Sequence, residues 1–384
     1  MKILHIITKL ELGGAQKNTL ANVIFLQHHY ETHLISGLDG ILNDYAKKNI
    51  KNFFEIKELI REINLKNDFI ALLKIIKYIK KNRFDIVHTH SSKAGILGRF
   101  AAFICKTPLI IHSIHGWSFN SEQKFLTRYF FILLEKLFSF FTNIFIAVSI
   151  DCIKVGLKRI NKNIEKYVLI HSGINFEEIY NGAKEENLWK EIREKCNILD
   201  DEKIIGTISC YKPQKNLIDF IYIADEIAKH YKNVRFIIIG DGEQRKQIED
   251  KIKELNLSKK IILTGWLLNP YGILNHFDFF VLTSLWEGLP RVFVEATLLE
   301  IPILTYEIEG ANEIIKNNFN GFIFKKKDYK GIAAKILDLL KNNEEYNKIK
   351  ENIKQQKKLL PEDFDINKMN RKILNLYKDN LRRV

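Results

Sequence analysis

The feature that most constrains the fold is an alternation of short apolar segments with longer amphipathic segments. The short segments have the length and composition of buried strands, and the longer segments between them have the period of helices. Strands that are apolar throughout and separated by helices are typical of a parallel sheet covered on both faces. In the first half of the chain, the predicted strands are residues 2–8, 31–36, 84–90, 109–115, 143–149 and 167–174.

The same alternation returns in the second half. The predicted strands there are residues 203–209, 234–242, 260–266, 277–284, 301–307 and 321–324. Because 384 residues exceed twice a typical domain of roughly 150, we expect two domains. We predict an α/β protein with two doubly wound, Rossmann-like domains facing across a cleft, residues 1–171 and 172–360. Residues 361–384 are expected to form a helix that packs back on the first domain.

Composition favours a cytoplasmic protein. The longest uncharged run in an apolar neighbourhood, residues 137–150, is shorter than the ~20 residues of a spanning helix. The amino terminus becomes polar too early for a secretory leader. The cysteines are widely spaced and are expected to be reduced, buried thiols: Cys105, Cys152, Cys196 and Cys210.

The positive charge is concentrated in the first half. Residues 1–171 contain 25 Lys and Arg against 13 Asp and Glu, whereas the remaining residues contain 35 against 33. Such a field favours polyanions such as nucleic acid, anionic lipid or a phosphorylated substrate. The alternative is a Lys-rich composition that only keeps the protein soluble.

Two carboxylates, Glu287 and Glu295, flank a predicted helix start in the stretch SLWEGLPRVFVEA. Proline suits the first helical position, so we predict that the helix begins at Pro290. The carboxylates would then lie on the order of 10 Å apart, with a helix N-terminus between them that can hold an anion. This arrangement fits a nucleotide sugar. The alternatives are a glycosidase pair, which in retaining enzymes needs about 5.5 Å, or two solvated glutamates.

Three other strand exits carry residues suited to phosphate. Lys212 and Lys215 stand beside a proline turn after residues 203–209, where two cations would form a phosphate site or a solvated pair. Gly13 and Gly14 follow the first strand and allow close backbone approach to a ligand, although the full dinucleotide-binding spacing is missing. Residues 240–242 form a similar glycine loop or a plain turn.

Histidines gather on two neighbouring predicted strands, at His88, His90, His112 and His115. They could ligate zinc, but the sequence shows no third ligand type at metal spacing, and hydrogen-bonded histidines at strand ends are the favoured interpretation. His115 precedes a glycine and is the best placed of the four to contact a ligand. We expect no metal site.

Taken in order, these segments match a known family. The chain resembles the retaining GT-B-fold glycosyltransferases of group 1, family four, in the branch that builds capsule, O-antigen and exopolysaccharide. The resemblance covers nearly the whole chain. It rests on ILHIITKLELGGAQKNTL, FDIVHTHSSKAGILGR, IHSIHGWSF, IHSGI, CYKPQKN, IIGDGEQR, TGW and LTSLWEGLPRVFVEA.

The resemblance implies roles for individual residues. Glu287 would contact hydroxyls of the donor hexose, Glu295 the ribose, and Trp266 would mark the loop that reads the nucleobase. The implied catalytic residues are Glu287, His115 and Lys215, and the implied acceptor-side residues are Gln16 and Lys93. The implied donor-binding residues are Gly13, Gly14, Lys212, Lys215, Asp241, Gly242, Trp266, Glu287, Gly288, Leu289, Pro290, Arg291 and Glu295.

One position departs from the family pattern. Most of the wider family has an arginine about five residues before the phosphate-binding lysine, and this chain has Cys210 there. Lys212 or Arg291 is the expected replacement for that cation.

By resemblance, the enzyme transfers a hexose with retention at the anomeric carbon and without an obligatory metal. The nucleotide diphosphate sugar is a co-substrate, and no cofactor is expected. Cations, the helix dipole and turn amides would stabilise charge on the leaving pyrophosphate.

The acceptor is expected to be a glycan linked to a lipid pyrophosphate. Residues 68–84 and 124–141 combine apolar and basic positions at helical spacing and would suit an anionic membrane surface, unless they are ordinary core-facing helices. Two other functions remain open, a sugar-nucleotide epimerase of the same architecture and a basic nucleic-acid-binding protein. The second lacks aromatic and basic side chains interleaved on a sheet face, so no nucleic-acid partner is expected.

Overall fold

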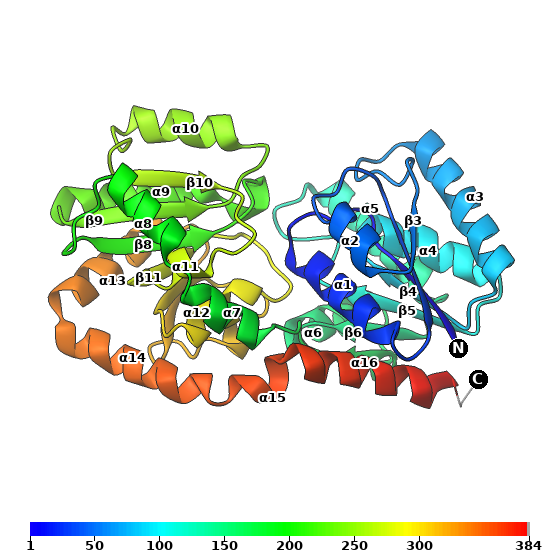
Figure 1. The fold of residues 1–384 in the computed structure, drawn as a ribbon. Helices are drawn as coiled ribbons and strands as arrows, with labels where there is room; N and C mark the ends of the chain where they lie inside the picture. Colours follow the sequence, from blue (N-terminus) through cyan, green and yellow to red (C-terminus); the bar gives the residue numbers. More distant parts are fainter. Residues whose placement is uncertain (382–384) are drawn as a thin grey trace. The chain divides into compact units, whose positions relative to one another are not determined.

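The computed structural model describes residues 1–381 and divides into two compact units, each with its own parallel sheet. The N-terminal unit comprises Met1–Gly173 with residues 363–381, and the C-terminal unit comprises Ile174–Glu362. Each sheet has helices on both faces (Figure 1). Two doubly wound α/β domains were predicted from the alternating pattern, and this fold class is confirmed.

Seven parallel strands form the sheet of the N-terminal unit, in the order β3-β2-β1-β4-β5-β6-β7. The order reverses at the neighbouring strands β1 and β4, so the loops that leave these two strands diverge and open a crevice at the carboxyl edge. The strands are β1 (Lys2–Ile6), β2 (Glu31–Ser36), β3 (Asn52–Glu55), β4 (Ile86–His90), β5 (Leu109–Ile114), β6 (Ile144–Ala147) and β7 (Tyr167–Leu169).

Helices cover both faces of this sheet. Beneath α3 and α4 lies one apolar cluster, and a second cluster joins Ile3 and Ile86 to Ile373 and Tyr377 of α16, the helix that packs beside α1. Residues late in the chain therefore complete the core of the N-terminal unit. The helices are α1 (Gly14–Leu26), α2 (Asn43–Asn49), α3 (Leu65–Asn82), α4 (Ser92–Ile104), α5 (Phe125–Ser139), α6 (Ile150–Arg159) and α16 (Ile366–Leu381), with the 3₁₀ turn η1 (Ile164–Lys166).

Strand β3 is absent from the sequence-based prediction. It has four residues, NFFE, and none of them is fully buried because the strand lies at the edge of the sheet. A short, half-exposed edge strand lacks the continuous apolar run by which the other strands were found.

The C-terminal unit repeats the topology with six parallel strands, in the order β10-β9-β8-β11-β12-β13. Here the order reverses between β8 and β11, which are the counterparts of β1 and β4. The strands are β8 (Lys203–Ile208), β9 (Val234–Ile239), β10 (Ile261–Gly265), β11 (Phe279–Leu282), β12 (Ile303–Tyr306) and β13 (Gly321–Phe324). The helices are α7 (Phe176–Ala183), α8 (Asn187–Lys195), η2 (Pro213–Lys215), α9 (Leu217–His230), α10 (Arg245–Glu254), α11 (Tyr271–Leu274), α12 (Arg291–Leu298), η3 (Ala311–Glu313), α13 (Tyr329–Lys341), α14 (Asn343–Lys357) and α15 (Leu360–Phe364), which contains the division between the units.

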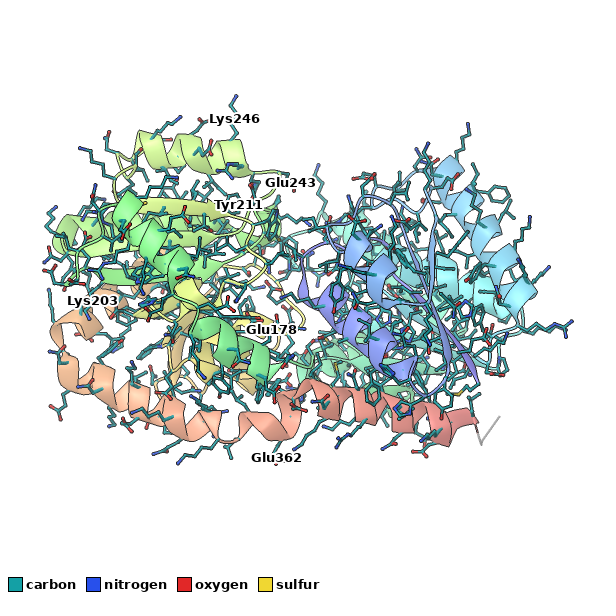
Figure 2. All side chains as sticks on the ribbon, viewed as in Figure 1. Glu178, Lys203, Tyr211, Glu243, Lys246 and Glu362 are labelled. Carbon is teal, nitrogen blue, oxygen red and sulfur yellow. The ribbon has the colours of Figure 1, made fainter. Side chains whose placement is uncertain are left out.

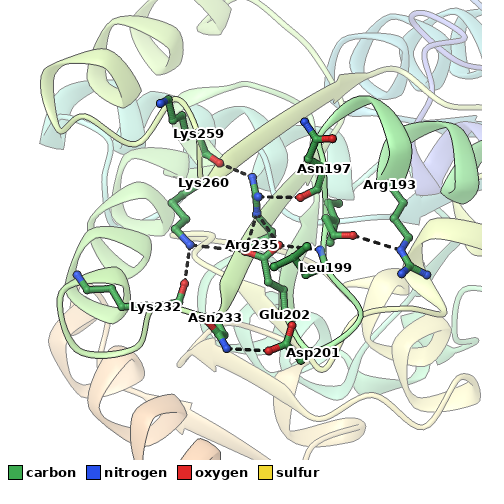
Figure 3. A network of polar contacts seen from close by, with 11 residues as sticks. Arg193, Asn197, Leu199, Asp201, Glu202, Lys232, Asn233, Arg235, Lys259 and Lys260 are labelled. Carbon is green, nitrogen blue, oxygen red and sulfur yellow. Dashed lines mark hydrogen bonds and ion pairs between the residues drawn. The ribbon is translucent and has the colours of Figure 1, made fainter.

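A polar network holds the amino edge of the second sheet (Figure 3). Arg235 of β9 donates two hydrogen bonds of 2.9 Å to the carboxylate of Glu202, just before β8. Burial alone would raise the pKa of Glu202, but the bonds from Arg235 hold it below its usual value. This end of the sheet is thus fixed by partly buried charge pairs, and it lies opposite the carboxyl edge. Figure 2 shows Tyr211 on that opposite side, near the start of α10.

Among residues 1–381, no helix combines the length and the apolar character needed to cross a bilayer.

Candidate functional site

The loops that leave β8 and β11 meet at the carboxyl edge of the C-terminal unit. β8 and β11 are paired in the sheet, and the loop after β8 carries the short turn η2. The hydroxyl of Thr283 donates bonds of 3.0 Å to the carbonyls of Lys215 and Asn216, and the amide of Leu285 donates to the carbonyl of Gln214 at 2.8 Å. These bonds fix one loop on the other before any ligand is present.

Lys215 and Glu287 form an ion pair within these joined loops. The Lys215 Nζ lies 2.5 Å from Oε1 of Glu287, and the two side chains are only 19% and 11% exposed. Burial alone would lower the pKa of Lys215, but the charge of Glu287 outweighs it and the pKa is raised. The lysine is therefore held as a cation at the edge of the sheet where phosphates bind in folds of this type.

Gln214 is a further residue of this site that the sequence analysis missed. Its side-chain amide donates to the carbonyl of Trp286 at 2.7 Å and approaches Oε2 of Glu287 at 3.4 Å. Gln214 thus holds the Glu287 loop in place through a side chain. Its position between the two predicted lysines is the only signal in the sequence, and that signal does not reveal the bond partner.

Helix α12 follows the same loop and begins one residue later than predicted. Pro290 has an extended backbone, with ψ 101°, and stands at the N-cap, so the first helical residue is Arg291. The prediction that the helix starts at Pro290 is therefore wrong. Glu295 lies in the second turn and is only 7% exposed. The pKa of the buried Tyr271 phenol is raised, first by burial and then by the nearby carboxylate of Glu295.

Gly310 supports the Glu287 loop from behind. It has φ +76°, and a Cβ atom at this position would lie 2.6 Å from the carbonyl oxygen of Gly288 and 3.0 Å from Cα of Leu289. Only glycine allows both this backbone conformation and this close approach. The loop after β12 therefore shapes the turn at Gly288 and Leu289.

The remaining predicted donor residues of this unit lie on strand exits. Lys212 is the N-cap of η2, and Trp266 directly follows β10 with 39% of its surface exposed. Asp241 and Gly242 form the loop after β9. The carboxylate of Asp241 accepts from the Gly242 amide at 2.8 Å and pairs with Arg245 at 2.6 Å, so its side chain stabilises its own turn.

In the N-terminal unit, the exits of β1 and β4 border a pocket of about 440 Å³. This volume is in the range of small-molecule sites. Thr8, Lys9 and Ser91 line its polar side, and the hydroxyls of Thr8 and Ser91 are 2.8 Å apart. Gln16 and Lys93, the two predicted acceptor-side residues, both line this pocket.

The walls of this pocket differ in character. Lys93 pairs with Asp68 at 2.6 Å, whereas no carboxylate of residues 1–381 forms an ion pair with Lys9. Gly13 is the N-cap of α1 and Gly14 is the first residue of this helix. The apolar wall is formed by α4 and α5 through Ile96, Leu97, Phe130, Phe131 and Leu134.

A cluster of buried histidines lies on the face of this sheet covered by α1 and α16. The register of β1 and β4 places His5 beside His88, and His90 follows on the same face of β4. One nitrogen from each of His5, His88 and His90 lies within 4.8 Å of the others. Nδ1 of His90 is 3.3 Å from Nε2 of His115. The sequence analysis did not include His5, because strand register is not visible in sequence.

A buried ion pair fixes α5 on α4. Arg99 donates to Glu135 at 2.8 Å, and both side chains are at most 2% exposed. The hydroxyl of Ser118, three residues after His115, donates to the other oxygen of Glu135 at 3.3 Å. The loop after β5 is thus attached to the helix that forms the apolar wall of the pocket.

Comparisons with known proteins agree with this geometry. Residues 25–178 match the model of Glycosyltransferase Family 4, and residues 189–356 match the model of Glycosyl transferases group 1. The chain is 30% identical over 332 residues to the UDP-Gal:alpha-D-GlcNAc-diphosphoundecaprenol alpha-1,3-galactosyltransferase of Escherichia coli, with 85% of each chain covered. It is 27% identical over 348 residues to the capsular polysaccharide biosynthesis glycosyltransferase CapM of Staphylococcus aureus, covering 88% of this chain and 87% of CapM.

A solved structure shares the whole fold. The crystal structure of Anabaena Alr3699/HepE in complex with UDP and glucose superposes with a TM-score of 0.82 at 17% identity, covering 99% of this chain and 100% of that one. Together with the sequence relatives, this likeness confirms the GT-B fold and the family that the motifs indicated. The chain therefore belongs to the group 1 glycosyltransferases, in family 4.

Proposed function

We propose that this glycosyltransferase moves a hexose from a nucleotide diphosphate sugar to a glycan carried on a lipid diphosphate, with retention at the anomeric carbon. The observation that carries the proposal is the buried pair of Lys215 and Glu287 beside the start of α12. It offers a cation and a carboxylate beside a helix N-terminus within one loop system. A nucleotide sugar needs this combination of partners, because its diphosphate lies between two hydroxylated groups.

The pair suggests how the leaving group is stabilised. Lys215 stays charged at neutral pH because Glu287 raises its pKa. A diphosphate that arrives beside Lys215 gains a cation already held in position, which costs no reorganisation when negative charge develops on the leaving oxygen. Glu287 is then left to accept hydrogen bonds from hexose hydroxyls. Lys212 and Arg291 are the candidates for the second cation.

Glu295 supports the ribose end of the same ligand. It is nearly buried in the second turn of α12, eight residues beyond Glu287. A buried carboxylate gains from hydroxyl donors that replace lost water. We assign Glu295 to the ribose, and Trp266 to the loop at the nucleobase.

The two-sided pocket of the N-terminal unit supports a lipid-linked acceptor. Lys9 and the hydroxyls of Thr8 and Ser91 suit a diphosphate, whereas Ile96, Phe130 and Leu134 suit an apolar chain. Gln16 and Lys93 would contact the sugar or phosphate of this acceptor. The named Escherichia coli relative acts on a sugar attached to diphosphoundecaprenol, which has the same two-sided chemistry.

Helix α5 supports attachment to a membrane surface on the cytoplasmic side. Phe125, Leu126 and Tyr129 are 78%, 78% and 52% exposed, and Lys124 and Arg128 lie among them. Apolar side chains with interspersed cations bind the interface of an anionic bilayer. Residues 68–84 are a weaker candidate, because Ala71, Ile75 and Ile79 of α3 face the core.

The proposed reaction uses no metal and no bound cofactor, because Lys215, the α12 amides and the turn at Gly288 would supply the positive charge. The proposal also assigns no nucleic-acid partner. The basic residues of the protein would bind phosphate and lipid headgroups instead.

The donor proposal is tested by thermal-shift screening against a panel of nucleotide sugars with and without EDTA. A ligand that binds only the folded state raises the melting temperature. The matching donor is then used with a lipid-diphosphate sugar, and the anomeric configuration of the product is read by NMR. Glu295→Ala is expected to weaken nucleotide binding by about 10- to 100-fold, the effect of losing hydrogen bonds to a charged group. Glu300→Ala is the control, because it removes a carboxylate that follows the same helix and pairs with Lys357.

Unchanged nucleotide affinity in Glu295→Ala would remove the ribose assignment, and an inverted product would remove retention. Epimerised donor in the absence of acceptor would favour the epimerase instead.

Membrane attachment is tested by sedimentation with anionic vesicles. Phe125→Ser with Leu126→Ser should reduce the bound fraction several-fold, because about 1.5–3 kcal/mol is lost for each large apolar side chain that no longer inserts. Leu359→Ser, which changes a leucine of the C-terminal unit that is 59% exposed, should leave the bound fraction unchanged. Equal binding of the wild-type chain and the α5 variant would contradict the membrane proposal.

A further inference from the structure

We propose that a buried chain of hydrogen bonds, which begins at Tyr377 on α16 and passes through His5 and His90, fixes the ring nitrogen on which His115 carries its proton. Tyr377 is therefore a positioning residue for His115. The catalytic consequence rests on the proposed function, in which His115 contacts the transferred sugar. The structural part of the proposal stands without it.

The inner half of the chain joins three histidines. Nδ1 of His5 lies 3.0 Å from Nε2 of His90, and the rings are nearly parallel, with an interplanar angle of 12°. The other nitrogen of His90, Nδ1, lies 3.3 Å from Nε2 of His115. Each ring thus uses one nitrogen toward the core and the other toward His115.

The outer half passes through the tyrosine. The Tyr377 hydroxyl lies 3.5 Å from Nε2 of His5 and 2.5 Å from Nδ1 of His88. Nε2 of His88 lies 2.8 Å from the hydroxyl of Ser113, which ends the chain. Tyr377 lies 289 positions from His88 and 372 from His5 in sequence, and it reaches both because α16 packs over the strands that carry the histidines.

The imidazoles of His5, His88 and His90 are neutral. His5 and His88 are 0% exposed and His90 is 3% exposed. Burial lowers the pKa of His5 to about 3 and lowers the pKa of the other two well below the usual value. A neutral imidazole has one N–H and one lone pair, so a ring that donates from one nitrogen must accept at the other.

This rule couples all the links. If His88 donates to Tyr377, the hydroxyl of Tyr377 donates to His5. His5 then donates to His90, and His90 donates to Nε2 of His115, which must carry its proton on Nδ1. If the direction is reversed, every donor becomes an acceptor and His115 carries its proton on Nε2. The chain therefore has two ordered arrangements, and each of them specifies one tautomer of His115.

Zinc binding by His5, His88 and His90 is the rival explanation, since their ligand atoms are close enough. All six nitrogens of these rings already have a hydrogen-bond partner between 2.5 and 3.5 Å away. Zinc would need three lone pairs directed at one point about 2.0–2.1 Å from each, so His88 would have to give up a bond to Tyr377 or Ser113. The hydrogen-bonded chain accounts for every nitrogen without such a change.

The test removes the hydroxyl of Tyr377 alone. In Tyr377→Phe, His5 and His88 lose their shared partner, so the proton position on His88 no longer determines the proton position on His5. The ring ¹⁵N shifts of His115, assigned by their absence in His115→Ala, should change from those of one tautomer to a mixture. Tyr78→Phe is the matched control. The Tyr78 hydroxyl lies 2.8 Å from Nδ1 of His33, and neither residue belongs to the hydrogen-bonded chain of Tyr377.

The kinetic readout uses the donor identified by the screen. Tyr377→Phe should lower kcat by about tenfold and leave the KM for the donor unchanged. The expected decrease in kcat is smaller than that for losing a positioned general acid or base, because Tyr377 acts through His115. If Tyr377→Phe does not fold, 3-fluorotyrosine at position 377 keeps the hydroxyl and weakens its basicity, and a smaller change of the same ¹⁵N shifts is expected.

Unchanged His115 shifts in the variant that folds would overturn the proposal, as would one equivalent of zinc in the purified protein. Changed shifts with unchanged kcat would retain the tautomer coupling and remove its catalytic role. Because the ¹⁵N measurement needs no substrate, a failure of the proposed function, seen as no turnover with any donor, is distinguished from a failure of the chain.

Discussion

The two units carry the same strand order and use its reversal point in opposite ways. In the C-terminal unit, the exits of β8 and β11 are joined by the ion pair of Lys215 and Glu287. In the N-terminal unit, the exits of β1 and β4 are joined by the hydroxyls of Thr8 and Ser91, and neutral histidines stand behind them. One edge is built from charge and the other from uncharged hydrogen bonds.

The difference in charge follows from what each buried group has as its partner. Lys215 remains ionised because a carboxylate lies within hydrogen-bond distance and outweighs the cost of desolvation. The hydrogen-bond partners of His5 are His90 and Tyr377, neither of which is a carboxylate, so burial lowers its pKa and the ring is neutral. One fold thus gives a fixed charge for a phosphate in one unit and a chain of transferable hydrogen bonds in the other.

The largest expected effect is that the two units unfold at different pH values when the solution is acidified, the N-terminal unit first. A histidine whose folded pKa lies below 6.5 binds its proton in the unfolded chain first, so stability is lost as the pH falls below 6.5. For His5, the loss approaches about 1.4 kcal/mol per pH unit between the unfolded and the folded pKa, and the lowered pKa values of His88 and His90 act in the same direction. In the C-terminal unit the pKa values of His276 and Glu202 are lowered, but the contribution of Glu202 is lost only as the pH falls below about 4.5, and that of Lys215 only at alkaline pH, above 10.5.

The measurement is ¹⁹F NMR of the chain labelled with 5-fluorotryptophan. Trp117 is the one tryptophan of residues 1–173, and Trp189, Trp266 and Trp286 report on the other unit. The Trp117 signal should change to its unfolded position at a higher pH than the other three. Simultaneous loss of all four signals would contradict the comparison.

Much of the fold could be predicted from sequence because each strand is a short apolar run. The predicted strands correspond to β1, β2 and β4 to β13, and only the edge strand β3 was missed. Helix α12 was misplaced by one residue because proline is accepted both at the N-cap, as here, and at the first helical position. Local propensity decides whether a segment is a helix or a strand, and the residue at which it begins depends on the turn that precedes it.

The side-chain partners at the sites could not be predicted in the same way. Lys215 and Glu287 were each assigned to the ligand, and their bond to each other depends on loops 72 residues apart in sequence. His5 reaches His88 only through strand register, and Tyr377 through the packing of α16. These contacts are tertiary, so no local pattern records them.

Removal of the charge at the C-terminal edge should have the next largest effect. Lys215→Met is expected to lower kcat by about 10²- to 10³-fold, the usual cost of losing one group that stabilises transition-state charge. Glu287→Gln should be comparably severe, and the double variant should be less severe than the product of the two, because the groups act as a pair. Steady-state kinetics on the identified donor measures all three.

Lys203→Met provides the matched control for this prediction. Lys203 pairs with Asp278 at 2.9 Å at the amino edge of the same sheet, far along the strand from the donor loops. Its kcat should stay within about twofold of the wild type, as expected for a partly exposed ion pair worth about 0–1 kcal/mol. An equal loss of activity in Lys203→Met and Lys215→Met would mean that any ion pair of this unit has the same effect, and that Lys215 has no special role.

The smallest expected effect concerns Ser91, at the uncharged edge. Its backbone has φ +62° and ψ 159°, a conformation that side chains rarely adopt, and its hydroxyl accepts from the Thr8 amide at 3.2 Å. Ser91→Ala should cost about 1 kcal/mol of unfolding free energy, because the hydroxyl is lost and the strain remains. Ser91→Gly loses the same hydroxyl but relieves the strain, so urea denaturation should find it within about 0.5 kcal/mol of the wild type. If glycine were as destabilising as alanine, the hydroxyl alone would hold this edge together and the backbone of Ser91 would store no strain.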